Sequence, residues 1–382
     1  MITVTHPTGN AFVRALLDHL EREHRLTRFF TTIATRNRRS YPIPAARIDT
    51  NPARELTRLA LQSLRTPLTR HETGWASVDA IYRALDQRTA RWVKTNARSV
   101  TWVYAYEDGA LETFLAARRA GIRRACELPI AYWTTTRHLL REEAARLPEW
   151  EPTLGATRDS GEKLARKTEE LNLADLIVCP SQFVIDSLPP QARARSLLAP
   201  FGSPPATPRK QRPAGPLRVL FAGAMTQRKG LADLFAAMKL LRRPDIQLVV
   251  MGSALMPMEF YRKQFDAFVY EPPRPPAAVL DLMAACDVLA LPSIVEGRAL
   301  VQQEAMSCGL PVLATRNAGA EELIAEAGFL VPIRSPEDIA AHLQRLADDR
   351  SLLETMSRRA QAAAARYTWQ SYAAGIAAAL QP

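Results

Sequence analysis

The chain has 382 residues, which is long for a single hydrophobic core and suits two domains. Its hydrophobic share of 47% and charged share of 23% are those of a globular protein and exclude a disordered chain. No apolar run approaches the roughly 20 residues that a membrane-spanning helix needs. The four cysteines are scattered without metal or redox spacing, which fits reduced thiols, and we expect a cytoplasmic protein.

The net charge of +11 allows attraction to nucleic acid, anionic lipid or diphosphate substrates. Arginines cluster in the first half, but aromatic residues are not interleaved with them as they are in nucleic-acid platforms. The clusters are Arg36/Arg38/Arg39, Arg118/Arg119 and Arg123/Arg124. We therefore expect no nucleic-acid partner and favour scattered solvated arginines, with a membrane-facing patch on the basic first domain as the alternative.

Strands and helices alternate along the first half. The apolar pattern predicts strands at 2–5, 29–33, 100–106, 122–126 and 176–181, and helices at 11–23, 109–121 and up to 147, with mostly helical sequence from 50 to 98. Gly9-Asn10 forms a strand–glycine–helix turn, which is either a ligand loop or a tight connection. Tyr132, after the strand at 122–126, is either a cleft residue or a packing contact at a domain edge.

Residues 204–216 are rich in proline and basic residues and free of apolar periodicity, so they read as an interdomain linker. The first domain is then 1–203 and the second 217–366, and a helix at 367–382 is expected to pack back onto the first. Strands are predicted in the second domain at 217–222, 246–252, 268–272, 288–291, 312–315 and 329–331, with helices between and after them. This order implies two doubly wound parallel sheets, whose ligands bind at the carboxyl ends of the strands.

Two stretches of the second domain carry the chemistry. In 223–230, Arg228 and Lys229 stand at the entrance to a helix, where a positive charge opposes the helix dipole and therefore indicates an anionic ligand. In 288–309, a buried strand ends before a loop with Glu296, and a helix ending near Gly309 carries Glu304. At 1.5 Å per helical residue the two carboxylates lie on the order of 10 Å apart, so they suit the two ends of an extended ligand rather than one metal ion.

Glu296 and Glu304 with seven residues between them, followed by Ala305-Met306 and Gly309-Leu310-Pro311-Val312, resemble the E-x7-E signature of retaining glycosyltransferases of family 4, which have the GT-B fold. Lys229-Gly230 also matches that family, where Arg and Lys of this segment neutralise the donor diphosphate. Ala224 stands in place of the family's arginine. Our hypothesis is that Arg228 takes over the role of that arginine. The resemblance is close in the second half and loose in the first.

The resemblance implies a nucleotide-diphosphate sugar as donor, a glycan or lipid-linked acceptor, retention of configuration, and no cofactor or metal. It assigns the reaction to Glu296, which orients the sugar, and to Arg228 and Lys229. The donor-binding residues it implies are Glu304, Gly297, Arg298, Ala299, Leu300, Gly223, Tyr270, Glu271 and Pro272, and the acceptor or cleft residues are Gly9, Asn10 and Tyr132. In line with a metal-free site, no Asp-x-Asp stands at a strand end.

Three departures from the family pattern keep other functions open. Ala224 replaces the family's arginine, Arg298 stands where the family favours an aromatic residue, and the family's first-domain histidine is absent near Tyr132. A non-catalytic sugar-nucleotide-binding protein and a nucleotide-sugar epimerase on the same fold are therefore the alternatives.

Overall fold

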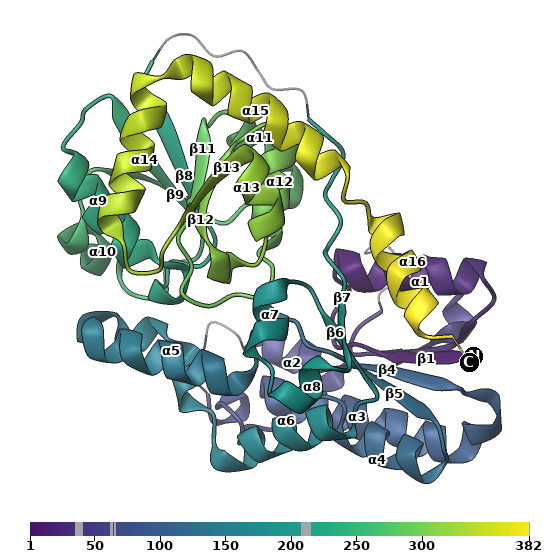
Figure 1. The fold of residues 1–382 in the computed structure, drawn as a ribbon. Coiled ribbons are helices and arrows are strands. Elements are labelled where there is room, and N and C mark those ends of the chain that lie inside the picture. Colours follow the sequence, from purple (N-terminus) through teal and green to yellow (C-terminus); the bar gives the residue numbers. More distant parts are fainter. Residues whose placement is uncertain (35–40, 62–63, 65, 208–214, 382) are drawn as a thin grey trace.

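The computed structural model describes residues 1–34, 41–61, 64, 66–207 and 215–381, and folds them around two parallel sheets (Figure 1). Arg36, Arg38 and Arg39, and residues 208–214 of the predicted linker, lie outside the described residues. Within the described part of the chain, no helix is both long and apolar enough to cross a bilayer.

The first sheet has seven strands in the order β3-β2-β1-β4-β5-β6-β7. They are β1 (Ile2–Thr5), β2 (Leu26–Thr31), β3 (Ile48–Thr50), β4 (Trp102–Tyr106), β5 (Arg123–Glu127), β6 (Leu176–Cys179) and β7 (Ser196–Leu198). The helices are α1 (Ala11–Arg22), α2 (Ala53–Ala60), α3 (Val78–Asn96), α4 (Leu111–Arg119), α5 (Trp133–Arg146), α6 (Gly161–Leu173), α7 (Gln182–Ser187) and α8 (Pro190–Arg193). The strand order reverses direction between β1 and β4, which makes the carboxyl edge there the expected ligand position.

The second sheet has six strands in the order β10-β9-β8-β11-β12-β13, with its reversal between β8 and β11. They are β8 (Leu217–Ala222), β9 (Ile246–Met251), β10 (Phe268–Glu271), β11 (Val288–Leu291), β12 (Val312–Thr315) and β13 (Gly328–Val331). The helices are α9 (Leu231–Leu241), α10 (Met258–Gln264), α11 (Pro276–Ala284), α12 (Leu300–Ser307), α13 (Glu321–Ala327), α14 (Pro336–Asp348) and α15 (Arg350–Ala365). Every residue of β11 and β12 is buried, as the apolar run at 288–291 predicted for β11.

The last helix, α16 (Trp369–Ala379), returns to the first domain and lies beside α1 (Figure 1). The guanidinium of Arg25 donates to the carbonyls of Ala377 (2.9 Å) and Leu380 (2.8 Å) at its end. Phe201, where the chain leaves the first domain, stacks on Phe12 with 4.9 Å between ring centroids. Both crossings between the domains are thus held against the first sheet.

A segment of the first half also packs onto the second domain. The 3-10 helix η4 (Pro148–Thr153) follows α5, and its Trp150 is 1% exposed within the hydrophobic core of the second domain, against Phe260 and Tyr261. Nearby, the buried carboxylate of Glu143 accepts hydrogen bonds from Arg146 (2.7 Å) and Gln227 (2.8 Å). This α5–η4 arm is therefore part of the contact between the two domains.

A candidate donor site between the two domains

Two loops at the carboxyl edge of the second sheet are hydrogen-bonded to each other. One joins β8 to α9 and contains the 3-10 helix η6 (Gln227–Lys229), and the other joins β11 to α12. The carbonyl of Arg228 accepts from the amides of Ile294 (2.9 Å) and Val295 (3.3 Å), and the Arg228 guanidinium donates to the Val295 carbonyl (3.0 Å). The segments that sequence reasoning singled out, far apart in the chain, are thus brought together.

Glu296 lies between the two predicted cations. Its Oε1 is 3.0 Å from the guanidinium of Arg228 and accepts a short hydrogen bond from the ammonium of Lys229. Burial alone would raise the pKa of Glu296, but Arg228 and Lys229 outweigh it and hold that pKa below its usual range. Two cations and one ionised carboxylate leave a net positive charge, which favours an anion at this point.

The backbone beneath Lys229 has no room for side chains. Gly223 has φ +145°, and a methyl group on it would press on the Lys229 side-chain stem. A methyl group on Gly252, which follows β9, would overlap the Gly223 carbonyl. The Tyr270 hydroxyl donates to the Gly252 carbonyl at 3.1 Å. Tyr270, Gly252, Gly223, Lys229 and Glu296 therefore form one chain of contacts along the carboxyl edge.

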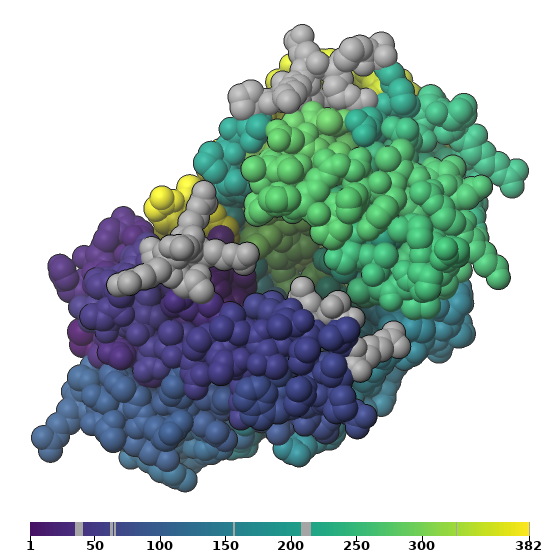
Figure 2. Space-filling model, turned by 180° about the vertical axis from the view of Figure 1, so that it is seen from behind, coloured from purple at the N-terminus to yellow at the C-terminus, as the bar shows by residue number. Residues whose placement is uncertain are grey.

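The carboxyl edges of the two sheets face each other across this site. A methyl group on Gly297 would overlap the carbonyl of Pro129, in the loop after β5, so glycine is required for the approach. The hydroxyl of Ser181, after β6, donates to the Gly297 carbonyl at 2.6 Å. On the face drawn in Figure 2, a hollow separates the green second domain from the purple and blue first domain.

The remaining predicted donor residues lie around the same loops. Glu304 is half-buried on α12, and burial raises its pKa; among the described residues no hydrogen bond or ion pair engages its carboxylate. Ala299 is buried and Leu300 half-buried at the start of α12. Glu271 ends β10 and pairs with Arg274, and Pro272 beyond it is exposed.

The structure gives Arg298 internal partners. Its side chain is buried, and its guanidinium donates to Gln303 (2.9 Å), the Gly319 carbonyl (3.1 Å) and Glu322 (2.6 Å). Gln303 in turn donates to the Phe201 carbonyl in the crossing between the domains. Arg298 thus connects the start of α12 to the chain crossing between the domains through Gln303.

In the first domain, the predicted turn Gly9-Asn10 lies partly at the surface, whereas the predicted cleft residue Tyr132 is buried. Gly9 is half-buried over the Tyr41 ring, and Asn10 is exposed at the start of α1. Tyr132 is 2% exposed in the first-domain core, with its hydroxyl 3.1 Å from Thr168 Oγ1. This is the packing position named as the alternative for Tyr132, and it gives the side chain no opening onto the cleft.

Sequence reasoning missed a buried pair at the carboxyl edge of the first sheet. His6 follows β1 and Glu127 ends β5, and His6 Nε2 lies 3.8 Å from Glu127 Oε2. Burial lowers the pKa of His6 to about 3 and raises that of Glu127 to about 8, so both are neutral at pH 7. An acidic residue directly after the predicted strand 122–126, two positions before Pro129, was the available signal.

The second domain matches a known family model. Residues 205–363 match the model described as "Glycosyl transferases group 1". A similar curated protein is the D-inositol 3-phosphate glycosyltransferase of Paenarthrobacter aurescens (strain TC1), 32% identical over 203 residues, which are 50% of this chain and 50% of that protein. The chain thus spans about half the length of the curated relatives it matches.

Solved structures resemble the whole chain. Sucrose-phosphate synthase from Thermosynechococcus elongatus has a TM-score of 0.68 at 18% identity, covering 99% of this chain and 97% of the other. Anabaena Alr3699/HepE in complex with UDP has a TM-score of 0.67 at 18% identity, covering 99% of each chain. The predicted two-domain GT-B fold is confirmed by these full-length likenesses.

Proposed function

We propose that this chain is a retaining glycosyltransferase of family 4 that moves a sugar from a nucleotide-diphosphate sugar to a glycan or lipid-linked acceptor without a metal. The observation that carries the proposal is the Arg228–Lys229–Glu296 cluster, held between two hydrogen-bonded loops in a domain that matches a glycosyltransferase model.

The cluster suits the charge that develops during transfer. Breaking a glycosidic C–O bond gives an oxocarbenium-like transition state with negative charge on the departing diphosphate. Arg228 and Lys229 are positioned to take up that charge once phosphate oxygens compete with Glu296 for them. Such preorganised electrostatic stabilisation is usually the largest catalytic contribution. Glu296 then orients the sugar, and Glu304 accepts hydrogen bonds from the nucleotide ribose.

The donor nucleotide is best sought with UDP, because a structure with the same fold was solved with UDP bound. Ligands that bind the native state raise its melting temperature. A thermal-shift series over nucleotides identifies the base, and inositol phosphate serves as one acceptor to test because the curated relatives are named for it.

The decisive experiment compares Lys229→Ala and Glu304→Ala with two controls. Each variant should lose at least about tenfold in transfer, corresponding to about 1.4 kcal/mol of transition-state stabilisation or more. The matched controls are Lys239→Ala on α9 and Glu354→Ala on α15, both of which are exposed, and both should transfer at the wild-type rate. Wild-type transfer by both site variants would remove the assignment.

Two further measurements separate the alternatives. Full activity in the presence of a chelator supports metal-independent transfer, and a strict Mg²⁺ requirement contradicts it. Nucleotide release with a new glycosidic bond identifies a transferase, conversion of the donor to its epimer identifies an epimerase, and binding without turnover identifies a sugar-nucleotide-binding protein.

A further inference from the structure

Helix α2 on the first domain carries its apolar side chains outward. Leu56 is 50% and Leu59 39% exposed, and no residue of α2 is buried. Its polar residues face the protein instead: the guanidinium of Arg54 donates to the Trp75 carbonyl (3.2 Å) and the Ala80 carbonyl (3.3 Å). A surface helix normally buries its apolar stripe in the core of its own domain, so this orientation indicates a partner outside the chain.

The apolar surface continues beyond α2. Among the described residues twelve large hydrophobic side chains are exposed, and six of them fall between positions 56 and 78. This apolar surface consists of Leu56, Leu59, Leu64, Leu68, Trp75 and Val78. The segments that carry these side chains are linked, because Arg54 of α2 lies 5.1 Å over the Trp75 ring and the Ala76 amide donates to the Leu68 carbonyl at 2.8 Å. Contiguous exposed apolar surface marks an interaction site.

A cavity of about 600 Å³ opens within this surface. Among the described residues, its lining includes two arginines and three hydroxyl side chains but no acidic residue: Arg58, Leu64, Thr66, Pro67, Thr69, Arg70, Ala76, Ser77 and Val78. Arg58 is paired with Glu55, whereas no hydrogen bond or ion pair engages the Arg70 side chain within the described part of the chain. A cation and hydroxyl donors beneath an apolar rim complement an anionic head group joined to apolar chains.

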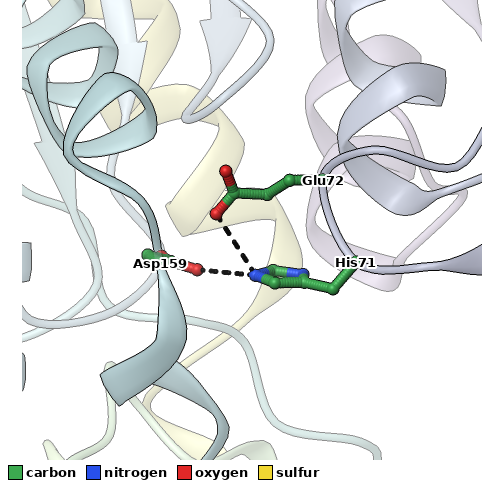
Figure 3. Close-up of side chains that lie close together, drawn as sticks. All are labelled: His71, Glu72 and Asp159. Atoms are coloured by element: carbon green, nitrogen blue, oxygen red, sulfur yellow. Dashed lines mark ion pairs between the residues drawn. The ribbon is translucent and has the colours of Figure 1, made fainter.

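The segment is anchored rather than loose. His71 Nε2 lies 3.3 Å from Glu72 Oε1 and 3.3 Å from Asp159 Oδ1, as Figure 3 shows. The ammonium of Lys163 is 3.1 Å from Asp159 and 2.9 Å from Asp79. These ion pairs hold residues 71–79 against the loop before α6, so Trp75 and Val78 are presented on a fixed framework.

We propose that this apolar surface docks on a bilayer containing anionic lipid, with the leucines and Trp75 entering the interface and a lipid phosphate binding Arg70 in the cavity. Tryptophan, leucine and arginine together are the composition of interfacial segments. The sequence from 53 to 78 carries four arginines and two glutamates, and the whole chain carries +11, so charge favours an anionic surface. Residues of this segment, dark blue in Figure 2, lie on the face that carries the hollow, so docking would bring the site to the membrane.

The test is co-sedimentation of the full chain with vesicles of phosphatidylglycerol and phosphatidylcholine, and with phosphatidylcholine alone. The wild type should bind the anionic vesicles and bind the neutral ones at least tenfold more weakly. Leu56→Asp/Leu59→Asp should lower binding to anionic vesicles at least tenfold. The matched control is Leu240→Asp/Leu255→Asp, which changes two exposed leucines of the second domain and should bind as the wild type does.

Further measurements distinguish a bilayer from other binding partners of this apolar surface. Arg70→Glu should weaken binding to anionic vesicles and leave the melting temperature unchanged, because the side chain is exposed. The proposal is overturned if the wild type ignores anionic vesicles, or if both double variants bind equally. It is also overturned if light scattering finds a dimer that Leu56→Asp/Leu59→Asp dissociates, since a second copy would then cover the surface.

Discussion

Replacing Glu127 with glutamine should stabilise the protein by an amount that grows with pH. Glu127 is buried beside the neutral His6, and burial raises its pKa from 4.5 to about 8, with only a partial offset from the Tyr104 hydroxyl. At about 1.4 kcal/mol per pKa unit, this rise corresponds to about 5 kcal/mol. The side chain is thus held protonated in the native state at a cost that glutamine does not incur.

The sign follows from which state ionises first. Below pH 4.5 Glu127 is protonated in both states, so it places no pH-dependent penalty on folding. As pH rises from 4.5 to about 8, the unfolded chain ionises and the native state does not, so the free energy of unfolding of the wild type falls. Glutamine ionises in neither state, so the stability difference between Glu127→Gln and wild type should widen by up to about 5 kcal/mol across that window.

The assay is urea unfolding of both proteins at several pH values, from below pH 4.5 up to about pH 8. Glu143→Gln is the matched control, because Glu143 is also buried, but Arg146, Gln227 and Arg334 overcome the effect of burial and lower its pKa. Glu143→Gln should destabilise the protein at neutral pH, and this loss should shrink as the pH falls below 4.5. A difference for Glu127→Gln that is constant with pH, or that shrinks as pH rises, refutes the reasoning.

Three other substitutions test particular contacts. Gly297→Ala should reduce transfer at least tenfold, because the added methyl group would overlap the carbonyl of Pro129 in the facing domain; unchanged turnover would contradict this. Trp150→Ala should cost about 3–5 kcal/mol in unfolding free energy, as for other large buried aromatics, and a loss below about 1 kcal/mol would show that the second-domain core does not depend on it. Arg298→Leu should lower the melting temperature because Gln303 and Glu322 lose a buried cationic partner. The control Arg316→Leu removes an exposed side chain and should leave the melting temperature unchanged. Equal effects of the two substitutions would contradict an internal structural role for Arg298.

The sequence predicted the three central strands of the second sheet well, because nearly all of their residues are buried. Three strands, 217–222, 288–291 and 312–315, match β8, β11 and β12 residue for residue. Two strands of the first sheet, β3 and β7, escaped prediction. Both are edge strands of three residues, too short to show a distinct apolar run.

The site was predictable where backbone chemistry constrained the residues. Glycine turns and cations at a helix entrance were enough to predict that Arg228, Lys229 and Glu296 belong to one site. Three features could not be predicted, because they depend on contacts between distant segments that no local pattern encodes. They are the inward orientation of the Arg298 side chain, the burial of Tyr132 and the His6–Glu127 pair. Whether the residues that meet here act on a sugar nucleotide stays a prediction.

The α5–η4 arm determines how the chain can be divided into separately expressed parts. Trp150, contributed from before the linker, completes a core whose other members begin at Leu217. Expressed alone, the second domain would keep a hole lined by Phe235, Phe260 and Tyr261 and would leave Asp233 without Arg146. A productive dissection therefore supplies residues 133–153 in trans, and binding of that peptide should rescue the isolated half.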